Sequence, residues 1–503
     1  MAASRVLSRR DVGFLLYEWL DVGRLPERER YAAHDRQTFD AVLDLAEELA
    51  CEVFAPINRL LDVDEPRIGA DGRVVQPPEL AAALRAYAAS GLSASTFDVA
   101  YGGAQLPYVV KAAASVFLQG ASIAAYAYPF LSEGNASLLV AHGTPEQIRT
   151  YAVPVIEGRW YGTMCLSEPH AGSSLADITT TAVVQDDGSY RVTGSKMWIS
   201  GGDHELSENI VHLVLAKTPG APAGTKGISL FVVPRFLVRD DGGLGERNDV
   251  ALVGLNHKLG YRGTTNTLLS FGEGAWNPGG RPGAVGYLVG AEGQGLQCMF
   301  HMMNEARIGV GSGAVALGYT GYLHALDYAT TRTQGRRLGR RDPTSPPVAI
   351  VEHPDVRRML LAQKAYVEGG LALTLFCARL VDETGGTEEA EALLRLLTPV
   401  AKSWPSTWCL KANDLAIQVH GGYGYTRDFP VEQFYRDNRL NPIHEGTHGI
   451  HASTCSGARS PKATPWSGWP HGCGRRSAGP KRQEARPPRT ATTSNARWPS
   501  SPG

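Results

Sequence analysis

The sequence predicts an α+β protein built from three consecutive domains in the order helix, sheet, helix. Apolar residues recur at helical spacing up to about residue 160 and again after about residue 293. Between these blocks, short β-branched or alternating segments are separated by Gly, Pro and Asp clusters, which indicates a small antiparallel β-domain. This order suits separate domains better than an alternating α/β sheet.

The composition is that of a soluble globular protein. The 503 residues suffice for two or three domains, and the hydrophobic (43%) and charged (20%) contents are ordinary. The formal net charge of -1 gives no overall field to attract nucleic acid or an anionic membrane. Seven cysteines form no C-x-x-C pair, and no apolar run approaches the ~20 residues of a membrane span. The first residues lack the basic, apolar and small-residue pattern of a signal peptide, so we expect none. We therefore expect a cytoplasmic protein with no metal site and no membrane span.

Three stretches of the first block predict helices. The apolar positions of Phe39–Phe54 keep helical spacing until Pro56 interrupts the pattern. Leu80–Ala89 predicts a similar helix, and the Ala-rich segment Val109–Tyr128 predicts a buried one. The turn-rich loop Tyr101–Pro107 lies between the last two.

Four segments of the second block predict strands, and four of the third predict helices. The strands are expected at Tyr190–Ser200, Ile210–Ala216, Gly227–Val233 and Thr264–Phe271. The helices are expected at Met299–Thr331, Val356–Val381, Glu388–Lys402 and Ser406–Val419. Gly309, Gly311 and Gly313 fall inside the first of these helices with no strand before them. They therefore indicate close helix packing rather than a dinucleotide-binding loop.

Two motifs with chemical potential stand near the end of the third block. The pair Gly421–Gly422 leaves the backbone open to a ligand, because no side chain stands in the way. About 25 residues later a single carboxylate, Glu445, stands beside Gly446 and Thr447. One motif is suited to hold a cofactor and the other to remove a proton. On its own, such a carboxylate is more often a residue that faces the dipole of a helix N-terminus.

A third motif lies at the start of the β-domain. In Met164–Ser173, small residues admit close approach of a ligand, and the Ser167 hydroxyl can donate a hydrogen bond. Backbone amides of such a loop can bond to a flavin ring and stabilise its reduced form. Trp198 and Ser200 follow after a predicted hairpin. Taken alone, Trp198 is more often a core aromatic and Ser167 a cap or turn residue, whereas their conjunction indicates a flavin.

Together these motifs resemble those of the acyl-CoA dehydrogenase flavoenzymes. The matching signatures are the family's Gln-x-x-Gly-Gly at Gln418–Gly422, its Glu-Gly-Thr at Glu445–Thr447, and its Thr-Glu-Pro-x-Ala-Gly-Ser at Ser167–Ser173. The resemblance spans roughly residues 35 to 452. The segment Leu15–Leu20 lies before the start of shorter members and resembles the extension of the longer, 3-methylmercaptopropionyl-CoA dehydrogenase-like subgroup.

The resemblance implies the fold of that family and a division into domains. We expect an N-terminal extension at 1–35, an N-terminal helical domain at 36–160, a middle β-domain at 161–292, a C-terminal helical domain at 293–452 and a tail at 453–503. The family places a loop like Tyr101–Pro107 near the substrate entrance, although a plain helix connection explains it equally well.

The resemblance also implies FAD-dependent α,β-dehydrogenation of an acyl-CoA thioester. Glu445 would remove the α-proton while flavin N5 accepts the β-hydride, and burial would raise the pKa of Glu445 towards the working pH. Electrons would pass to an electron-transferring flavoprotein. The implied cofactor-binding residues are Met164, Leu166, Ser167, Trp198, Ser200, Arg332, Gln418, Gly421, Gly422, Thr447 and Gly449. The implied substrate-binding residues are Ser173, Asn304, Arg307 and Gly446.

Two positions leave alternatives open. The family usually reads Arg-x-x-Phe-Gly where this chain has Arg332-Thr-Gln-Gly-Arg336, so Arg336 or Arg337 could bind the flavin pyrophosphate instead of Arg332. In the family this arginine serves a flavin held mainly by the neighbouring subunit, which implies a homodimer or homotetramer. Some relatives carry the base on the helix near Arg307, where Glu305 is the nearby carboxylate.

The composition changes abruptly after Ala452. From Ser453 to Gly503 there is no Leu, Ile, Val, Met, Phe or Tyr, so this segment cannot bury enough apolar surface to fold. Plausible codons for Ser453–Ser460, read in the neighbouring frame, spell Leu-Asp-Leu-Leu-Gly-Arg-Lys-Val, an ordinary amphipathic continuation. We hypothesise a one-base deletion, which sequencing the gene would test.

Two other functions compete with the enzymatic interpretation. One is a nucleic-acid-associated relative of the same fold with vestigial redox activity, for which the basic tail is the argument. The other is an inactive, frameshifted product. The sequence does not indicate acyl chain length, branching or thioether preference.

Overall fold

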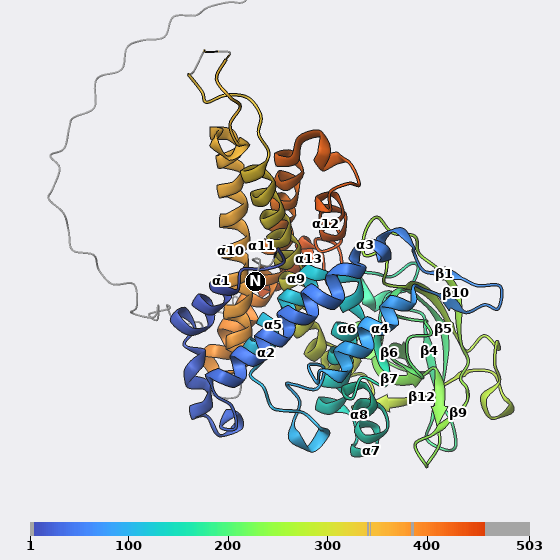
Figure 1. Cartoon of the computed structure of the whole chain (residues 1–503). Coiled ribbons are helices and arrows are strands. Elements are labelled where there is room, and N and C mark those ends of the chain that lie inside the picture. Colours follow the sequence, from blue (N-terminus) through green and yellow to red (C-terminus); the bar gives the residue numbers. More distant parts are fainter. Residues whose placement is uncertain (1–4, 340–341, 343, 384–386, 458–503) are drawn as a thin grey trace, which may run out of the picture. The chain divides into compact units, whose positions relative to one another are not determined.

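The computed structural model describes residues 5–339, 342, 344–383 and 387–457, without the side chains of 304 and 454–457. Figure 1 shows helices at both ends of the described chain and a β-sheet region between them in sequence. The predicted α+β class is confirmed. Most of the predicted tail lies outside the described residues.

The N-terminal region is helical, apart from one short hairpin. Its main helices are α1 (Arg9–Gly13), α2 (Arg36–Glu48), α3 (Ala55–Val63), α4 (Pro78–Ala89), α5 (Tyr108–Ala121), α6 (Ile123–His142), α7 (Pro145–Gln147) and α8 (Val153–Ile156), and its hairpin is β1 (Arg67–Ile68) with β2 (Val74–Val75).

Two helix predictions in this region were wrong, one at its end and one in its interior. Pro56 does not stop the helical path, because a π-helical stretch at Leu49–Phe54 leads into α3 and places the proline in its first turn, where the missing N–H costs little. The predicted helix Val109–Tyr128 is two helices that meet at Ser122, whose backbone is extended (φ -157°). Apolar residues continue on both sides of this bend, so hydrophobicity does not mark it.

The middle domain is a sheet with the strand order β10-β11-β5-β12-β7-β6-β3, and β4 pairs with β5 and β6. Its strands are β3 (Tyr161–Cys165), β4 (Thr181–Val184), β5 (Tyr190–Ser200), β6 (Ile210–Lys217), β7 (Ile228–Pro234), β10 (Val250–Leu255), β11 (Asn266–Phe271) and β12 (Ala284–Val289), beside a separate pair, β8 (Phe236–Val238) and β9 (Leu244–Arg247).

All four predicted strands exist, but the prediction of a purely antiparallel sheet was wrong. β3 and β4 both pair parallel with β6, and the other pairings in the sheet are antiparallel. The β3 pairing places Met164 opposite Leu213 and fixes the point from which the following loop leaves the sheet.

The C-terminal region consists of long helices. They are α9 (Gly295–Thr331), α10 (Pro354–Val381), α11 (Glu388–His420), α12 (Val431–Asn438) and α13 (His448–Gly457). α9, α10 and α11 pack side by side along most of their length (Figure 1). α13 runs five residues past the change of composition at Ser453.

The two helices predicted on either side of Pro405 form one continuous helix, α11. Pro405 has no N–H, so the carbonyl of Ala401 loses its intrahelical donor. Gly311 of α9 packs directly against this oxygen: a Cβ added to Gly311 would lie 2.0 Å from it. The interpretation of the α9 glycines as residues for close helix packing is therefore confirmed.

The N-terminal extension packs on the C-terminal helices. The Tyr319 hydroxyl of α9 donates a hydrogen bond to Asp11, and the Thr320 hydroxyl donates to the carbonyl of Val6 at 3.0 Å. The rings of Trp19 and Phe376 lie 5.8 Å apart, centre to centre. The N-terminal extension and the C-terminal helices thus belong to one compact unit.

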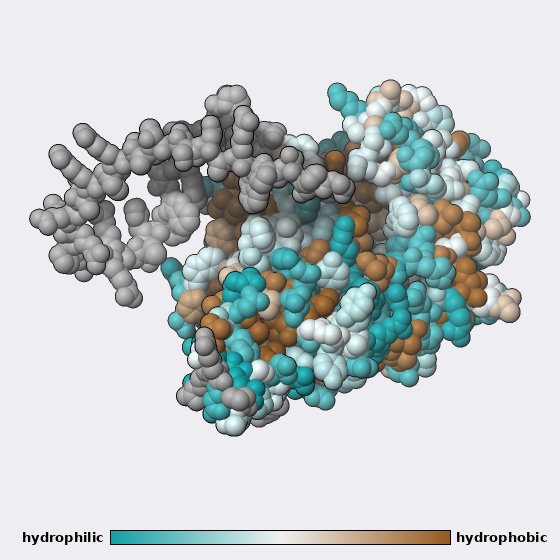
Figure 2. All heavy atoms as spheres, turned by 90° about the horizontal axis from the view of Figure 1, so that it is seen from above, coloured by the Kyte–Doolittle hydropathy of each residue, from teal (hydrophilic) through white to brown (hydrophobic). Residues whose placement is uncertain are grey.

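No helix among the described residues is long and apolar enough to cross a bilayer. Figure 2 shows one face of the molecule, on which small hydrophobic patches are interspersed with hydrophilic residues.

Candidate active site

The loop after β3 is held in place by a buried carboxylate. Glu168 accepts hydrogen bonds from the backbone N–H groups of Thr179 (2.7 Å) and Thr180 (3.0 Å), and Lys196 of β5 forms an ion pair with it at 3.0 Å. Burial alone would raise the pKa of Glu168, but Lys196 and these donors lower it to about 2. The carboxylate therefore remains charged and ties the Ser167–Ser173 loop to the sheet.

The same loop lies against the strand that carries Trp198. The backbone N–H of Met197 donates to the carbonyl of Ser167 at 3.0 Å, so the two predicted flavin motifs are adjacent. Ser200 accepts a hydrogen bond from Asn266 at 3.2 Å. Met164, Leu166, Ser167 and Ser200 are half-buried, and Ser173 is exposed.

Trp198 is not a core residue. Its side chain is 60% exposed, and its backbone lies in the left-handed region with φ +67°. A bulky residue in this region is a strained exception, and such exceptions concentrate at ligand sites. The indole is thus exposed, and Ser200, two residues later in β5, is half-buried.

Glu445 lies on a second strained turn, between α12 and α13. Glu445 has φ +52° and the following Gly446 has φ +93°. A Cβ on Gly446 would lie 3.0 Å from Nε2 of His451, so both the backbone angle and the close ring favour glycine. Lys402 of α11 donates a hydrogen bond from its ammonium group to the carbonyl of Gly446 at 2.6 Å.

Two cations face the half-buried carboxylate of Glu445. Burial raises its pKa, and the charges of Arg307 on α9 and of Lys402 oppose that rise. Arg307 is buried, and its Nε has no hydrogen-bond partner among the described residues. Glu445 therefore resembles a carboxylate poised to exchange a proton rather than one neutralised by a tight ion pair.

The histidines around this turn are uncharged at neutral pH. Burial lowers the pKa of His444 to about 3 and that of His451 to about 4, with Lys402 adding to both effects. Thr447 and Gly449, predicted to contact the flavin, are exposed at the start of α13. Asn304 lies in α9, but its side chain is outside the described residues.

The predicted pyrophosphate site lies at the other end of the long helices. Gln418, Gly421 and Gly422 are exposed, and Cβ atoms added to the two glycines would meet nothing within 4 Å. The guanidinium of Arg332 lies over the ring of Tyr423 at 5.8 Å and has no ion-pair partner within the described chain. The end of α9 and the turn after α11 thus present an uncompensated cation beside open backbone, a combination suited to a phosphate.

The predicted residues therefore fall into three groups. The Trp198 group lies on the β-domain and also contains Met164, Leu166, Ser167, Ser173 and Ser200. The Glu445 group lies in the C-terminal helices and also contains Asn304, Arg307, Gly446, Thr447 and Gly449. The Arg332 group also contains Gln418, Gly421 and Gly422. Within the described residues, no hydrogen bond or ion pair joins one group to another.

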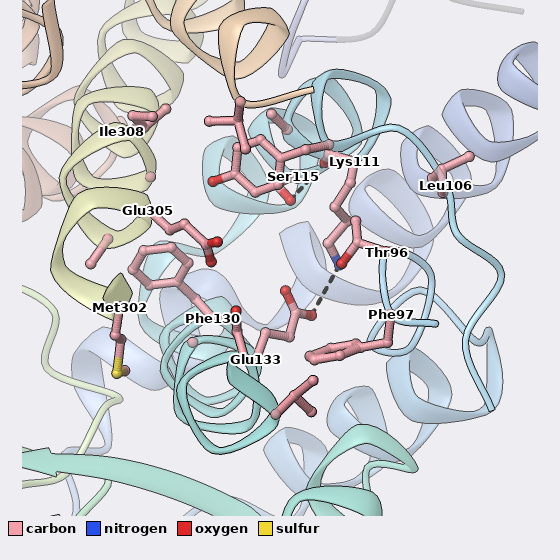
Figure 3. A pocket seen from close by; sticks show the side chains of 18 of the residues that line it. Thr96, Phe97, Leu106, Lys111, Ser115, Phe130, Glu133, Met302, Glu305 and Ile308 are labelled. Carbon is pink, nitrogen blue, oxygen red and sulfur yellow. Dashed lines mark hydrogen bonds and ion pairs between the residues drawn. The ribbon is translucent and has the colours of Figure 1, made fainter. Parts of the chain in front are cut away.

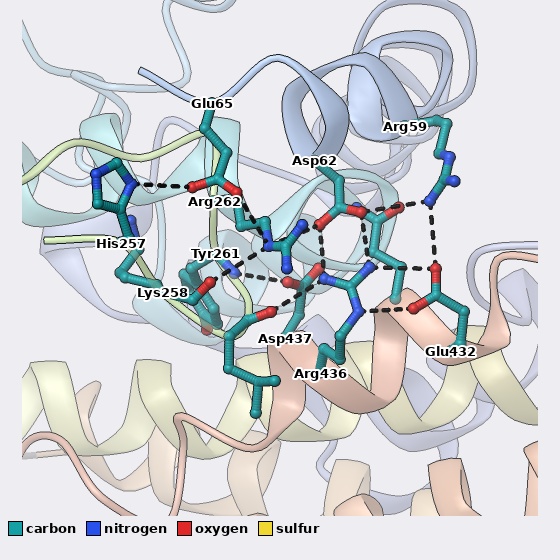
Figure 4. Close-up of polar contacts among 12 residues, drawn as sticks. Arg59, Asp62, Glu65, His257, Lys258, Tyr261, Arg262, Glu432, Arg436 and Asp437 are labelled. Atoms are coloured by element: carbon teal, nitrogen blue, oxygen red, sulfur yellow. Dashed lines mark hydrogen bonds and ion pairs between the residues drawn. The ribbon is translucent and has the colours of Figure 1, made fainter. Parts of the chain in front are cut away.

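An ion network holds α12, the helix that leads to Glu445. Arg436 forms an ion pair with Asp62 of α3 at 2.6 Å and one with Glu432 at 2.6 Å. Figure 4 shows Arg436 between these two carboxylates, with Arg262 also approaching Asp62. Asp437 accepts a hydrogen bond from the backbone N–H of Tyr261 at 2.6 Å. Residues from all three predicted domains thus meet at α12.

A cavity of about 800 Å³ lies among α5, α6 and α9. Lys111 and Glu133 form an ion pair at 2.9 Å on its wall, and Glu305 points into it from α9 (Figure 3). Burial raises the pKa of Glu305 to about 7, with Glu133 adding to the rise and the Ser137 hydroxyl opposing it. Glu305 is thus on the cavity side of α9, two residues from Arg307.

Sequence reasoning missed Lys402, Lys111 and Glu133. Lys402 was assigned only as the end of a helix, because 43 residues separate it from Glu445 in the sequence. A lysine on the buried side of a long amphipathic helix was the available signal, since lysine is seldom fully buried without a partner.

Comparison with known proteins identifies the chain. Residues 163–272 match the family described as "Acyl-CoA dehydrogenase, middle domain", and residues 293–457 match "Acyl-CoA dehydrogenase, C-terminal domain". The chain is 38% identical over 458 residues to the 3-methylmercaptopropionyl-CoA dehydrogenase of Ruegeria pomeroyi, covering 90% of this chain and 75% of that protein. The chain belongs to the acyl-CoA dehydrogenase family.

Other relatives of this acyl-CoA dehydrogenase agree. A butyryl-CoA dehydrogenase of Syntrophomonas wolfei is 34% identical over 479 residues, covering 92% of this chain and 77% of that protein. The solved butyryl-CoA dehydrogenase of Megasphaera elsdenii has the same fold, with a TM-score of 0.66 at 21% identity over 84% of this chain and 97% of that one. The predicted family, fold and flavin-dependent acyl-CoA dehydrogenation are confirmed.

Proposed function

We propose that this acyl-CoA dehydrogenase uses FAD and that Glu445 removes the α-proton of the thioester. The observation that carries the proposal is the setting of Glu445: a half-buried carboxylate on a left-handed turn, facing Arg307 and Lys402. Burial makes the carboxylate more basic, and the two cations keep it ionised without a tight salt bridge.

We propose that FAD binds across the Trp198 group and the Arg332 group. The exposed indole of Trp198 would cover the ring system, Ser167 and Ser200 would bond to its edge, and Arg332 with Gly421 and Gly422 would meet the pyrophosphate. The open glycines and the unpaired guanidinium support this assignment. Bound there, FAD would accept the β-hydride at N5 and pass the electrons to an electron-transferring flavoprotein.

The acyl group would lie between the β-domain and α9. We propose that Ser173, Asn304, Arg307 and Gly446 contact the thioester arm, with the backbone N–H of Glu445 stabilising the enolate oxygen. The distal part of the acyl chain would occupy the cavity among α5, α6 and α9. Its lining supports this role, because Met302 and Ile308 provide apolar contacts and Glu305 a polar one.

A pair of matched variants tests the base. We expect Glu445→Gln to bind FAD normally but to reduce the rate of flavin bleaching by acyl-CoA at least about 10²-fold. Glu305→Gln is the matched control, since it removes the other carboxylate near Arg307 and should retain bleaching. Anaerobic stopped-flow absorbance measures both rates. Bleaching that survives in Glu445→Gln and disappears in Glu305→Gln would assign the base to Glu305.

The same preparation separates the enzyme from the two competing interpretations. A yellow protein that acyl-CoA does not bleach would point to vestigial redox activity, and a colourless aggregate to an inactive product. The family match favours the enzyme.

A further inference from the structure

Lys402 is a fully buried lysine whose side chain donates a hydrogen bond to the turn that carries the proposed base. Its relative exposure is 0%, and its ammonium group donates to the carbonyl of Gly446 at 2.6 Å. It belongs to α11, whereas the turn follows α12. Burying an ammonium group is unfavourable unless a partner compensates, so this position calls for a functional reason.

The turn at Glu445 and Gly446 has a strained backbone that its surroundings must stabilise. Glu445 and Gly446 both have positive φ, and glutamate rarely adopts such a backbone unless its surroundings impose it. The hydrogen bond from Lys402 reaches the carbonyl of Gly446, in the peptide between Gly446 and Thr447. It therefore restrains the turn one residue beyond Glu445.

Among the described residues, five charged or titratable groups face Lys402. They are Arg307 of α9, His444 and Glu445 of the turn, and His448 and His451 of α13. Burial lowers the pKa of all three histidines, which leaves Arg307, Lys402 and Glu445 as the groups whose charges can interact at neutral pH. Glu445 is the one carboxylate in this set of described residues.

We propose that Lys402 is a positioning residue for the base: its ammonium group fixes the turn that carries Glu445, and its charge favours the ionised form of that carboxylate. The proposal rests on the proposed role of Glu445. Arg307 of α9 also contributes a positive charge near Glu445. Unlike Lys402, its side chain forms no hydrogen bond to the turn among the described residues.

The charge of Lys402 changes within the accessible pH range. Burial lowers the pKa of Lys402 to about 8, although Glu445 opposes the decrease. Below that pH the ammonium charge lowers the pKa of Glu445, which favours the ionised base. Above it the charge is lost, and the electrostatic contribution of Lys402 disappears.

The proposal is tested with three variants of the buried lysine: Lys402→Met, Lys402→Arg and Lys402→Gln. The control is Lys411→Met, which changes an exposed lysine on the same helix. The measurement is the rate of flavin reduction by saturating acyl-CoA between pH 5.5 and about 10, together with flavin content and melting temperature. We expect Lys402→Met to bind flavin, to shift the acid limb to higher pH and to be about tenfold slower at pH 6. The deficit should narrow above about pH 8, where the wild type loses the same charge.

Lys402→Arg retains a charge and a donor, so we expect it to recover most of the rate at pH 6. Lys402→Gln retains a hydrogen-bond donor without a charge, so its acid limb should shift as in Lys402→Met.

Two outcomes would overturn the proposal and leave Lys402 a purely structural residue: a loss of flavin-reduction rate that is equal at every pH, or an unchanged acid limb. If Lys402→Met does not fold, the comparison of Lys402→Arg with Lys402→Gln decides the same question. Full activity in Glu445→Gln would instead reject the base assignment on which the proposal rests.

Discussion

A single buried carboxylate connects sequence, stability and cofactor binding at the residue scale. Glu168 belongs to the Glu-Pro-x-Ala-Gly-Ser motif that this chain shares with its family, yet its side chain faces inward and contacts Lys196 and two threonines. Its role is to hold the loop that would face the flavin. A motif residue can therefore serve the site without touching the ligand.

Removing this carboxylate should loosen the flavin loop. We expect Glu168→Gln to lower the free energy of unfolding by about 3–5 kcal/mol, because it leaves the ammonium group of Lys196 buried without its counter-charge. Denaturant unfolding measures this loss, and Glu157→Gln at an exposed position is the control. Equal stability of Glu168→Gln and the wild type would show that the ion pair does not hold the loop.

The same pair predicts a pH dependence with a definite sign. The pKa of Glu168 is about 2 in the folded chain and lies near 4.5 for an ordinary glutamate. Its stabilisation is therefore present above about pH 4.5 and is lost as the pH falls towards 2. The melting temperature of the wild type should fall more steeply across this range than that of Glu168→Gln.

At the scale of elements, α12 anchors the segment that leads to the proposed base, Glu445. Asp62 of α3 is almost completely buried and receives two nitrogens of the Arg436 guanidinium at 2.7 and 2.6 Å. Gly260 packs so closely on the backbone of Arg436 that a Cβ would lie 2.5 Å from it. The short segment from α12 to Glu445 is thus anchored at its start by the N-terminal helices and the middle domain.

Breaking this anchor should affect stability and catalysis together. We expect Arg436→Met to lower the free energy of unfolding by about 3–5 kcal/mol, because Asp62 remains buried with a weaker set of cations around it. The remaining folded enzyme should bleach more slowly because the Glu445 turn loses its support. Denaturant unfolding and flavin reduction measure the two effects, and the exposed Arg395→Met is the control. An unchanged bleaching rate would show that α12 does not position the base.

At the scale of the whole molecule, α9 separates the proposed base from the proposed pyrophosphate site. Arg307, which faces Glu445, lies in the first half of α9 and Arg332 directly after its end, and 25 residues of α-helix span about 37 Å. Because the Arg332 group lies so far from the proposed base, we expect the flavin to be shared between two copies of the chain. The oligomeric state remains our prediction from the family resemblance.

A subunit-mixing experiment tests this sharing. We expect Trp198→Ala and Arg332→Ala each to bind FAD poorly, and a refolded mixture of the two to regain binding, because a mixed dimer contains one site with both intact residues. Flavin fluorescence measures the recovery. Tyr425→Ala, a 91% exposed neighbour of the glycine pair, is the control. A mixture that binds no better than its components would place each flavin within one copy.

Local patterns were enough to predict the chemistry and most elements. The flavin and base motifs are runs of consecutive residues, so they could be identified without knowledge of the fold. Strands such as Tyr190–Ser200 were found because alternation is a property of neighbours in sequence. The continuity of α11 through Pro405 was missed, because packing against α9 outweighs the local preference of proline.

Contiguous residues alone were enough to predict the family of this chain and its candidate base. The surroundings of that base became known only from the packing of the helices. Lys402 and Arg307 lie 43 and 138 positions from Glu445 along the chain, and they meet it because α9 and α11 pack side by side. Such proximity depends on how long helices are brought together, and no pattern of neighbouring residues records it.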